Sequence, residues 1–253
     1  MNWNTRQRRV VEVKARAERS DHMHSYCRAM GCSHPARAGT GDGLDRRYCR
    51  RHADHYQRHG SPFVDSYRAA QLNPNRRAAI DWLLAHPDEF WVKHAIRSVE
   101  GLYRRGGAYE EAFRLRGLTP KERAKIHWAR LRHFRVDPRV VVAAWLGVKL
   151  TVDDDIQAPS SPEFAQVQAA KVVHRLASGT HKRWKSTGQE LHVYPQSRGR
   201  VLRCVGQDLE RAVESLEHYH LTKICELRNQ KSSLYGPKCR AYPKTVAVRS
   251  RSD

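Results

Sequence analysis

Three cysteines and one histidine between residues 27 and 52 constrain the fold of this chain more than any other feature of its sequence. Cys27 and Cys32 form one close pair, and Cys49 and His52 form a second pair after a longer loop. Two close pairs joined by a loop supply the four ligands of a tetrahedral site, and thiolate with imidazole donors favours Zn²⁺ in a closed structural centre. The sequence therefore predicts a small, loop-built module over residues 27–62 that a zinc ion holds together.

Two further histidines compete with His52 for the fourth ligand position. His52 has the tightest spacing to Cys49, whereas His55 reaches the same place if residues 49–58 are helical, and His59 is the third candidate. The alternative to a metal site is three unpaired cysteines beside a few histidines of a basic loop. The paired spacing disfavours that alternative.

The sequence favours neither secretion nor insertion into a membrane. No apolar run approaches the length of a membrane span. Residues 1–20 are basic but lack the apolar region and the small-residue cleavage site of a secretory signal. We therefore expect a cytoplasmic protein, in a bacterium or a phage-infected host cell, with reduced thiols that bind metal rather than form disulfides.

The net charge points to a polyanionic partner. The 253 residues include 47 Lys and Arg against 26 Asp and Glu, which gives a formal net charge of +21. Self-repulsion of this size is most often explained by nucleic acid as the partner. The alternative is an ordinary basic protein from a GC-rich genome. A membrane-surface role would need a basic amphipathic helix with a bulky apolar face, or a lipidation motif, and the sequence has neither.

Residues 73–150 are expected to form a compact helical domain of about five helices, because apolar residues recur there at helical spacing. Three of its helices are expected to begin at Asn73, Thr119 and Asp137, since each is followed by a proline at the first helical position. Thr119 also forms a capping box with Glu122.

The rest of the chain completes a mainly α fold. Residues 151–231 are expected to form a second helical region with a short hairpin near 180–203, followed by a long amphipathic helix. Residues 1–26 form a basic N-terminal segment, and residues 232–253 are expected to be a basic, flexible tail.

The Cys/His segment resembles a short Cys-Cys-Cys-His zinc segment found in many phage and mobile-element proteins, where it often stands beside HNH-type homing endonuclease domains. The residues that match are Cys27, Gly31, Cys32, Pro35, Ala36, Cys49, His52, Arg58, His59, Gly60 and Pro62. The middle loop of this chain is longer than the usual pattern, and the remainder of the chain is not recognised. The resemblance implies a structural zinc module on a DNA-acting protein.

The chain offers only weak catalytic candidates. After residue 62 it has no His-Asn-His order within a window of ββα size, so the resemblance does not bring an HNH catalytic core with it. Asp153, Asp154 and Asp155, with Glu163 nearby, could bind Mg²⁺ as the carboxylates of nuclease sites do. Consecutive aspartates point in different directions, which favours a solvated loop instead. A second metal site, formed by Cys204, Cys225 and Cys239 with His218 or His220, is another weak candidate.

Basic residues gather in three places that suit contact with phosphates. They surround the metal ligands, they follow a Gly-containing turn in a helix-turn-helix-like pair over 108–135, and they alternate with Trp184 and Tyr194 in the hairpin region. The candidate contacts are Arg46, Arg47, Arg50, Arg51, Arg58, Arg123, Lys125, Arg130, Arg132, Lys182, Arg183, Lys185, Arg198 and Arg200. In the alternative interpretation these side chains are only solvated, and the two aromatic residues belong to the core.

Three function classes remain compatible with these observations. The favoured one is a zinc-stabilised nucleic-acid-binding protein, with DNA as the expected partner, from a phage or mobile element. The first alternative is a metal-dependent nuclease or other DNA-processing enzyme with a divergent site. The second is a structural or interaction protein that binds RNA or a host protein through its basic surface.

Overall fold

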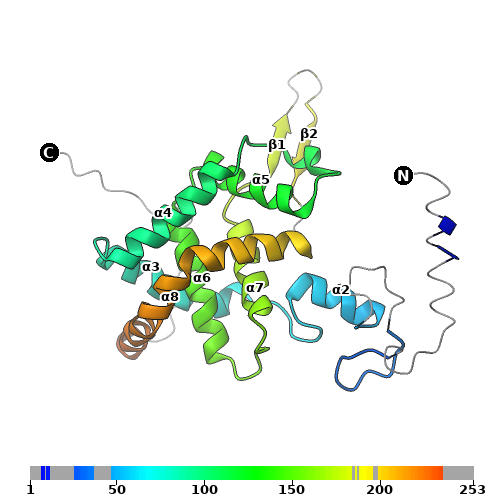
Figure 1. Ribbon diagram of the computed structural model, residues 1–253. Coiled ribbons are helices and arrows are strands. Elements are labelled where there is room, and N and C mark those ends of the chain that lie inside the picture. Colours follow the sequence, from blue (N-terminus) through cyan, green and yellow to red (C-terminus); the bar gives the residue numbers. More distant parts are fainter. Residues whose placement is uncertain are drawn as a thin grey trace. The chain divides into compact units, whose positions relative to one another are not determined.

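The computed structural model (Figure 1) describes residues 7, 8, 10, 11, 26–36, 47–183, 186, 188–195 and 199–235, without the side chains of residues 182 and 231–235. The chain divides into two compact units, Met1–Asp65 and Ser66–Asp253. From residue 26 to residue 235, the described part contains seven α-helices, one 3-10 turn and one two-stranded sheet. This mainly helical architecture, with a hairpin and an N-terminal Cys/His cluster, confirms the expected fold class.

The first unit combines a short loop with one helix. An isolated bridge joins Tyr26 to Pro35, so that residues 26–36 turn back on themselves. Helix α2 (Arg50–His59) follows Cys49 directly and ends at Gly60, which adopts the left-handed conformation with φ 80°. A glycine at this position lets the chain reverse at the helix end without steric cost.

The second unit is built around one central helix whose middle is completely buried. Its helices are α3 (Ala69–Ala85), α4 (Phe90–Arg105), α5 (Pro120–His133), α6 (Pro138–Asp154), α7 (Pro162–His174) and α8 (Arg200–Tyr235). Helix α6 contributes an unbroken run of buried residues from Val140 to Val148. Because this run is apolar on all sides, α6 must be covered on all sides, and it packs against α3, α4, α7 and α8.

Two glycines allow the helices of this unit to approach closely. A Cβ atom at Gly147 of α6 would lie only 2.5 Å from Cγ and 2.8 Å from Cα of Arg76 in α3. A Cβ atom at Gly206 of α8 would lie 2.5 Å from the backbone oxygen of Gln166 in α7. At these two crossings any larger side chain would push the helix backbones apart.

The predicted helix starts at Thr119 and Asp137 are confirmed. Thr119 Oγ1 accepts a 3.3 Å hydrogen bond from Glu122 N, and the Glu122 carboxylate accepts a 2.8 Å bond from Thr119 N, which completes the capping box. Asp137 Oδ1 accepts from Arg139 N at 2.8 Å and caps α6 in the same way.

The predicted start at Asn73 is wrong. Helix α3 begins at Ala69, because the Gln71 side chain accepts a 2.8 Å hydrogen bond from Arg68 N and so caps an earlier first turn. Pro74 lies within the helix, where it removes one backbone hydrogen bond early in its course. The neighbouring Asn75 is buried and donates a 2.8 Å hydrogen bond to Thr151 Oγ1 of α6.

The hairpin lies between α7 and α8 in the sequence. Strand β1 (Thr180–Arg183) pairs antiparallel with β2 (Glu190–Val193), with Thr180 opposite Val193 and Arg183 opposite Glu190.

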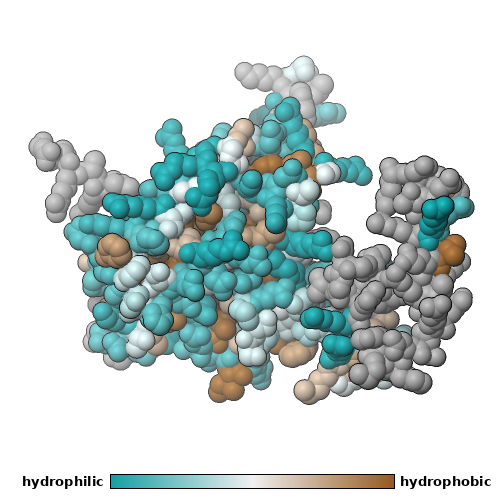
Figure 2. Space-filling model, in the orientation of Figure 1, coloured by the Kyte–Doolittle hydropathy of each residue, from teal (hydrophilic) through white to brown (hydrophobic). Residues whose placement is uncertain are grey.

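No described helix is both long and apolar enough to cross a lipid bilayer. The face of the helical unit seen in Figure 2 is covered mostly by hydrophilic residues.

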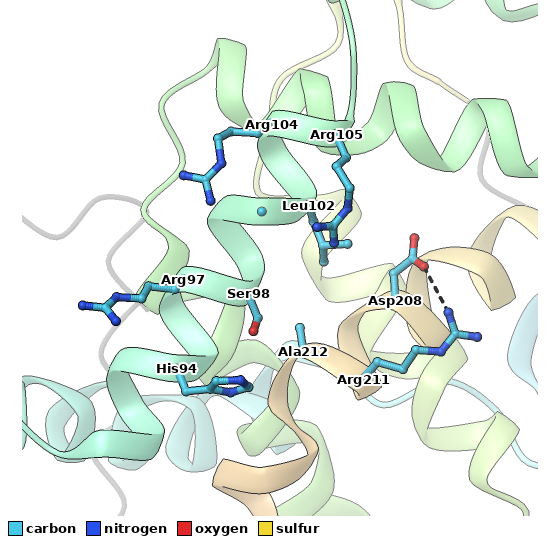
Figure 3. A pocket seen from close by; sticks show the side chains of 10 residues that line it. His94, Arg97, Ser98, Leu102, Arg104, Arg105, Asp208, Arg211 and Ala212 are labelled. Atoms are coloured by element: carbon cyan, nitrogen blue, oxygen red, sulfur yellow. Dashed lines mark ion pairs between the residues drawn. The ribbon is translucent and has the colours of Figure 1, made fainter.

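Helices α4 and α8 together border an open groove of about 400 Å³ (Figure 3). Arg97, Arg104 and Arg105 project from α4, and Arg211 projects from α8. All four side chains are exposed. The packing of the two helices therefore produces a depression whose rim is rich in guanidinium groups.

Candidate metal centre and basic surfaces

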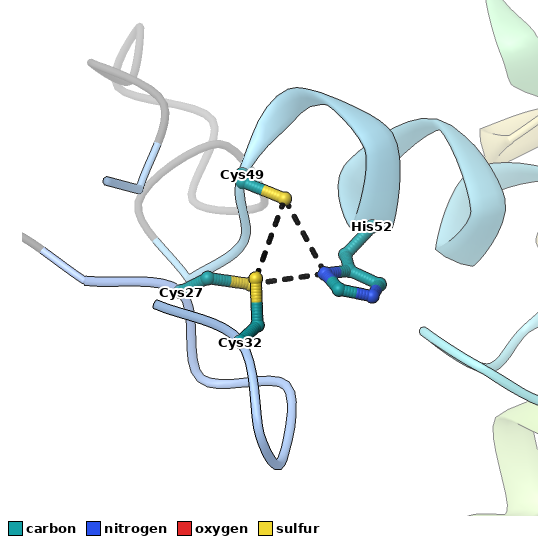
Figure 4. Close-up of side chains that lie close together, drawn as sticks. All are labelled: Cys27, Cys32, Cys49 and His52. Atoms are coloured by element: carbon teal, nitrogen blue, oxygen red, sulfur yellow. Dashed lines mark hydrogen bonds between the residues drawn. The ribbon is translucent and has the colours of Figure 1, made fainter. Parts of the chain in front are cut away.

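The three cysteines and His52 converge in the first unit (Figure 4). His52 Nδ1 lies 3.3 Å from Cys27 Sγ and 3.3 Å from Cys49 Sγ, and Cys32 Sγ lies 4.0 Å from Cys49 Sγ. Tetrahedral coordination with Zn–S bonds of about 2.3 Å places two sulfur ligands about 3.8 Å apart. The four groups therefore form a cluster that can hold a metal ion, and His52, rather than His55 or His59, lies with the three cysteines.

Backbone hydrogen bonds position these ligands. Cys27 N donates to His34 O at 2.9 Å and Cys32 N donates to Ala29 O at 3.0 Å, so the loop that carries both thiols is closed at two points. Cys49 occupies the N-cap position of α2, next to the positive end of the helix dipole. The start of α2 thereby holds Cys49 beside the loop that carries the other two thiols.

The pKa values of two cysteine thiols in the cluster are shifted from their ordinary values, and the shifts reflect how closely the thiols lie together. Burial alone raises the pKa of the Cys27 thiol, but backbone hydrogen bonds at Cys49 and Ala29 bring it below its ordinary value. A backbone hydrogen bond at His34 lowers the pKa of Cys32, yet burial and the neighbouring thiols raise it above its ordinary value. Several thiolates crowded together repel one another, and a divalent cation would relieve that repulsion.

The arginines near the ligands lie on the surface of the first unit. Arg47, Arg50, Arg51 and Arg58 are exposed, while Arg46 lies outside the described residues. Their exposure leaves these guanidinium groups accessible to a partner. Contact with nucleic acid remains a prediction for all five.

The weak carboxylate candidates do not converge on one another in the described part of the chain, where no group of potential metal ligands includes them. Asp153 is exposed, and the other three each have a different partner. Those partners are Arg228 for Asp154, Tyr67 for Asp155 and Arg203 for Glu163. Because these carboxylates already form ion pairs with arginines or accept a hydrogen bond from a tyrosine hydroxyl group, their arrangement does not favour a Mg²⁺ site.

The second cysteine group is also dispersed. Cys225 Sγ accepts a 3.3 Å hydrogen bond from Arg228, and His220 Nε2 lies 3.0 Å from a carboxylate oxygen of Glu89. Burial raises the pKa of the Cys204 thiol, which disfavours the metal-binding thiolate, and Cys239 lies outside the described residues. Neither Cys204 nor Cys225 belongs to a potential ligand group.

Two of the four basic side chains proposed in α5 serve the fold. Arg130 is only 4 % exposed and donates a 2.8 Å hydrogen bond to His174 O. Burial lowers the pKa of its guanidinium to about 10. Arg132 donates to Tyr103 O at 3.0 Å and also to Gly107 O, and it thereby satisfies carbonyl groups at the C-terminal end of α4.

The remainder of the expected helix-turn-helix-like pair is only partly formed. Its first member is a single 3-10 turn, Ala112–Leu115. Lys125 is exposed, and Arg123 is half-buried. A four-residue turn does not provide the supporting helix of a helix-turn-helix motif.

The basic residues of the hairpin region are only partly described. Arg183 is exposed and pairs with Glu190 at 3.5 Å across the two strands, and Arg200 is exposed at the start of α8. Trp184, Lys185 and Arg198, as well as the side chain of Lys182, lie outside the described residues.

The arginine-lined groove was not predicted from the sequence. Arg97, Arg104 and Arg105 have no ion-pair partner among the described residues, whereas Arg211 pairs with Asp208 at 3.8 Å. The spacing of Arg97 and Arg104, two helical turns apart on one face of α4, was the available signal. Helix α8 lies more than 100 residues later in the sequence. A local sequence pattern therefore gives no sign that it packs beside α4.

A comparison of the chain with models of protein families, with curated proteins and with solved structures finds no match in any of the three. The Cys/His cluster that the resemblance implied is present. The functional part of that resemblance has no further support from relatives, so the function must be argued from the sites themselves.

Proposed function

We propose that this protein binds nucleic acid, with DNA as the first candidate, and that the arginine-lined groove between α4 and α8 contacts the phosphate backbone. The groove is the observation that carries the proposal. Four exposed arginines border it, and three of them have no ion-pair partner among the described residues. Guanidinium groups form paired hydrogen bonds with phosphate oxygens, and an open groove leaves them free to do so.

The composition supports the same partner. A formal net charge of +21 favours association with a polyanion, and it creates self-repulsion that a polyanion would relieve. Phosphate contacts of this kind position a protein on a nucleic acid without reading its sequence. We therefore expect affinity with a strong dependence on salt and a weak dependence on base sequence.

In this proposal Zn²⁺ has a structural role in the first unit. Three thiolates and one imidazole are the donor set of closed zinc sites, which leave no position for a reacting water molecule. The zinc would hold the loop over residues 26–36 against α2 and so fix the arginines at positions 50, 51 and 58. Such a centre requires reduced thiols, which a cytoplasm maintains.

The proposal does not extend to catalysis. The carboxylates at positions 154, 155 and 163 have partners within the helical unit, so the arrangement lends no support to a nuclease centre there. A phage or mobile-element origin rests on the resemblance alone.

The test is a gel-shift titration of the full chain, with its zinc content measured, against duplex DNA, single-stranded DNA and RNA at two salt concentrations. The proposal predicts binding of duplex DNA that weakens by at least about tenfold when the salt concentration rises fourfold. Preferential binding of RNA would identify RNA, rather than DNA, as the partner. Absence of binding to all three would favour the structural or interaction role instead and would overturn the proposal.

A further inference from the structure

Helix α2 ends beside a second group of potential metal ligands, separate from the cluster of three cysteines and His52. His55 Nε2 lies 3.1 Å from Asp65 Oδ1, and His59 Nε2 lies 3.8 Å from the same oxygen. The two imidazole rings are stacked, with centroids 4.3 Å apart. One ligand atom from each of the three residues falls within 4.8 Å of the others.

These distances suit one metal ion. Zinc bonds of about 2.0–2.1 Å to nitrogen and oxygen place neighbouring ligand atoms about 3.3 Å apart. The two contacts of Asp65 Oδ1, at 3.1 and 3.8 Å, lie on either side of that value. His55 and His59 are four residues apart on α2, the spacing that places two side chains on the same face of a helix.

The loop after α2 is shaped so that the carboxylate faces the histidines. Gly60 reverses the chain at the helix end. Ser61 is completely buried, and its hydroxyl accepts hydrogen bonds from Phe63 N at 3.3 Å and Val64 N at 3.0 Å. These bonds close a tight turn, and the turn places the Asp65 carboxylate beside the two histidines of α2.

The same loop fixes the orientation of one imidazole. His55 Nδ1 donates a 2.8 Å hydrogen bond to Ser61 O. A neutral His55 that donates from Nδ1 presents a lone pair on Nε2, and that lone pair faces an oxygen of Asp65. A backbone carbonyl that binds the outer nitrogen in this way is the usual support of a metal-binding histidine. Two acceptor atoms 3.1 Å apart repel each other unless a cation lies between them, and the cation is either a metal ion or a second proton on His55.

We propose that His55, His59 and Asp65 bind a divalent transition-metal ion in an open, three-ligand site, in addition to the metal of the cluster of three cysteines and His52. Imidazole and carboxylate donors suit Zn²⁺ and neighbouring first-row ions better than Mg²⁺. The His55 and His59 side chains are 24 % and 21 % exposed, and that of Asp65 is 83 % exposed, so the site opens to solvent. Its remaining positions accept water or an oxygen of a bound ligand. This site is independent of the proposed binding of nucleic acid.

The experiment counts Co²⁺ and Zn²⁺ bound to the full chain at pH 7.5, where a proton competes weakly for imidazole. Cobalt distinguishes the two sites, because only the cysteine cluster gives thiolate-to-metal charge-transfer absorption. We expect two equivalents in the native chain, the second without that absorption. His55→Ala and His59→Ala should each lose one equivalent and keep the thiolate absorption, which shows that the module is still folded.

A matched control is His86→Ala, because His86 is an exposed histidine at the C-terminal end of α3 that belongs to none of the candidate ligand groups. It should retain two equivalents. Binding of a single equivalent by the native chain would overturn the proposal and leave the second proton as the cation. A second equivalent that persists in both histidine variants would also overturn it, because the metal would then bind elsewhere.

Discussion

Trp128 Nε1 donates a 3.1 Å hydrogen bond to Asp208 Oδ2, and this bond ties the acidic residue of the arginine-lined groove to the core of the helical unit. The other oxygen of the same carboxylate lies 3.8 Å from Arg211. Among the described residues that line the groove, Asp208 is the one with a negative charge. Its charge is thus engaged on two sides, which limits its repulsion of an approaching phosphate.

Removal of this charge should strengthen the binding of nucleic acid. Asp208→Asn keeps an acceptor for Trp128 and releases Arg211, so we expect affinity at low salt to rise by about two- to fivefold. Fluorescence anisotropy with a labelled duplex measures the change. Glu214→Gln alters the net charge equally at an exposed position of α8 outside the groove. An equal gain in that control would attribute the effect to net charge and not to the groove.

The close crossing of α3 and α6 predicts that Gly147→Ala destabilises the helical unit. The new methyl group would lie 2.5 Å from Cγ of Arg76 and 2.8 Å from its Cα atom, so backbone has to move. We expect the free energy of unfolding in urea to fall by about 1–3 kcal/mol. In the matched variant Gly101→Ala the methyl group meets only the flexible end of Arg105. Gly101→Ala should leave stability unchanged or raise it by up to about 1 kcal/mol, and equal losses in both variants would contradict the packing account.

Two buried histidines predict that acid destabilises the helical unit. His127 and His174 stack with ring centroids 5.2 Å apart, and His127 Nε2 has no hydrogen-bond partner among the described residues. Burial, and then the positive charge of Arg130, lowers the pKa of His174 to about 3. Burial also lowers the pKa of His127 far below its ordinary value.

The direction of the effect follows from these shifts. Burial keeps both imidazoles neutral in the folded protein, whereas they titrate near 6.5 when unfolded. The stability that they contribute is therefore complete above pH 6.5 and is lost as the pH falls, in the case of His174 down to its folded pKa of about 3. Between pH 6.5 and 5 the loss from His174 should be about 1.5 kcal/mol, and His127 adds to it in the same direction. Urea unfolding followed by the fluorescence of the core tryptophans measures this loss. His174→Gln should make the loss smaller by about 1.5 kcal/mol, and an unchanged pH dependence would show that other groups cause it.

Removal of the metal should unfold the first unit and leave the second intact. The buried apolar cluster of the described part of the first unit consists of Cys27, Ala29 and Cys49, with Cys32 and Tyr48 packed against it. A core of this size cannot hold a fold without a metal. A chelator should therefore accelerate tryptic cleavage within α2 by at least about tenfold, and added Zn²⁺ should restore protection. Unchanged cleavage would show that the metal is not needed for the fold of this unit.

The cluster of three cysteines and His52 was predictable from sequence because its information is local. Cys27 and Cys32, and likewise Cys49 and His52, are within one turn of each other, and thiolates in such pairs have few other uses in a reduced protein. The same short spacing favoured His52, but His55 and His59 stayed open as alternatives until the structure grouped His52 with the three cysteines. The helix caps at Thr119 and Asp137 are local in the same sense, since the residues that make the hydrogen bonds lie within three positions of each other.

The features that sequence did not reveal depend on contacts between distant segments. Arg130 looks like a surface cation of a basic helix, but the path of α7 buries it against His174. Arg104 of α4 and Arg211 of α8 line the same groove, although they are far apart in the sequence and no local pattern relates them. Asp65 carries no local signal of metal binding, since only the turn at Ser61 brings its carboxylate back to α2.

The most direct test of the proposed function is the salt dependence of DNA binding by the native chain and by the double variant Arg104→Ala/Arg105→Ala. If both arginines neutralise phosphates, the slope of the logarithm of the binding constant against the logarithm of salt concentration should decrease in magnitude by about 2. Arg114→Ala serves as the control, because Arg114 is exposed but lies 3.9 Å from Glu110 and 3.7 Å from Glu111. Its slope should stay within about 0.5 of the native value. A double variant with the native slope would contradict the assignment of the groove as the nucleic-acid contact.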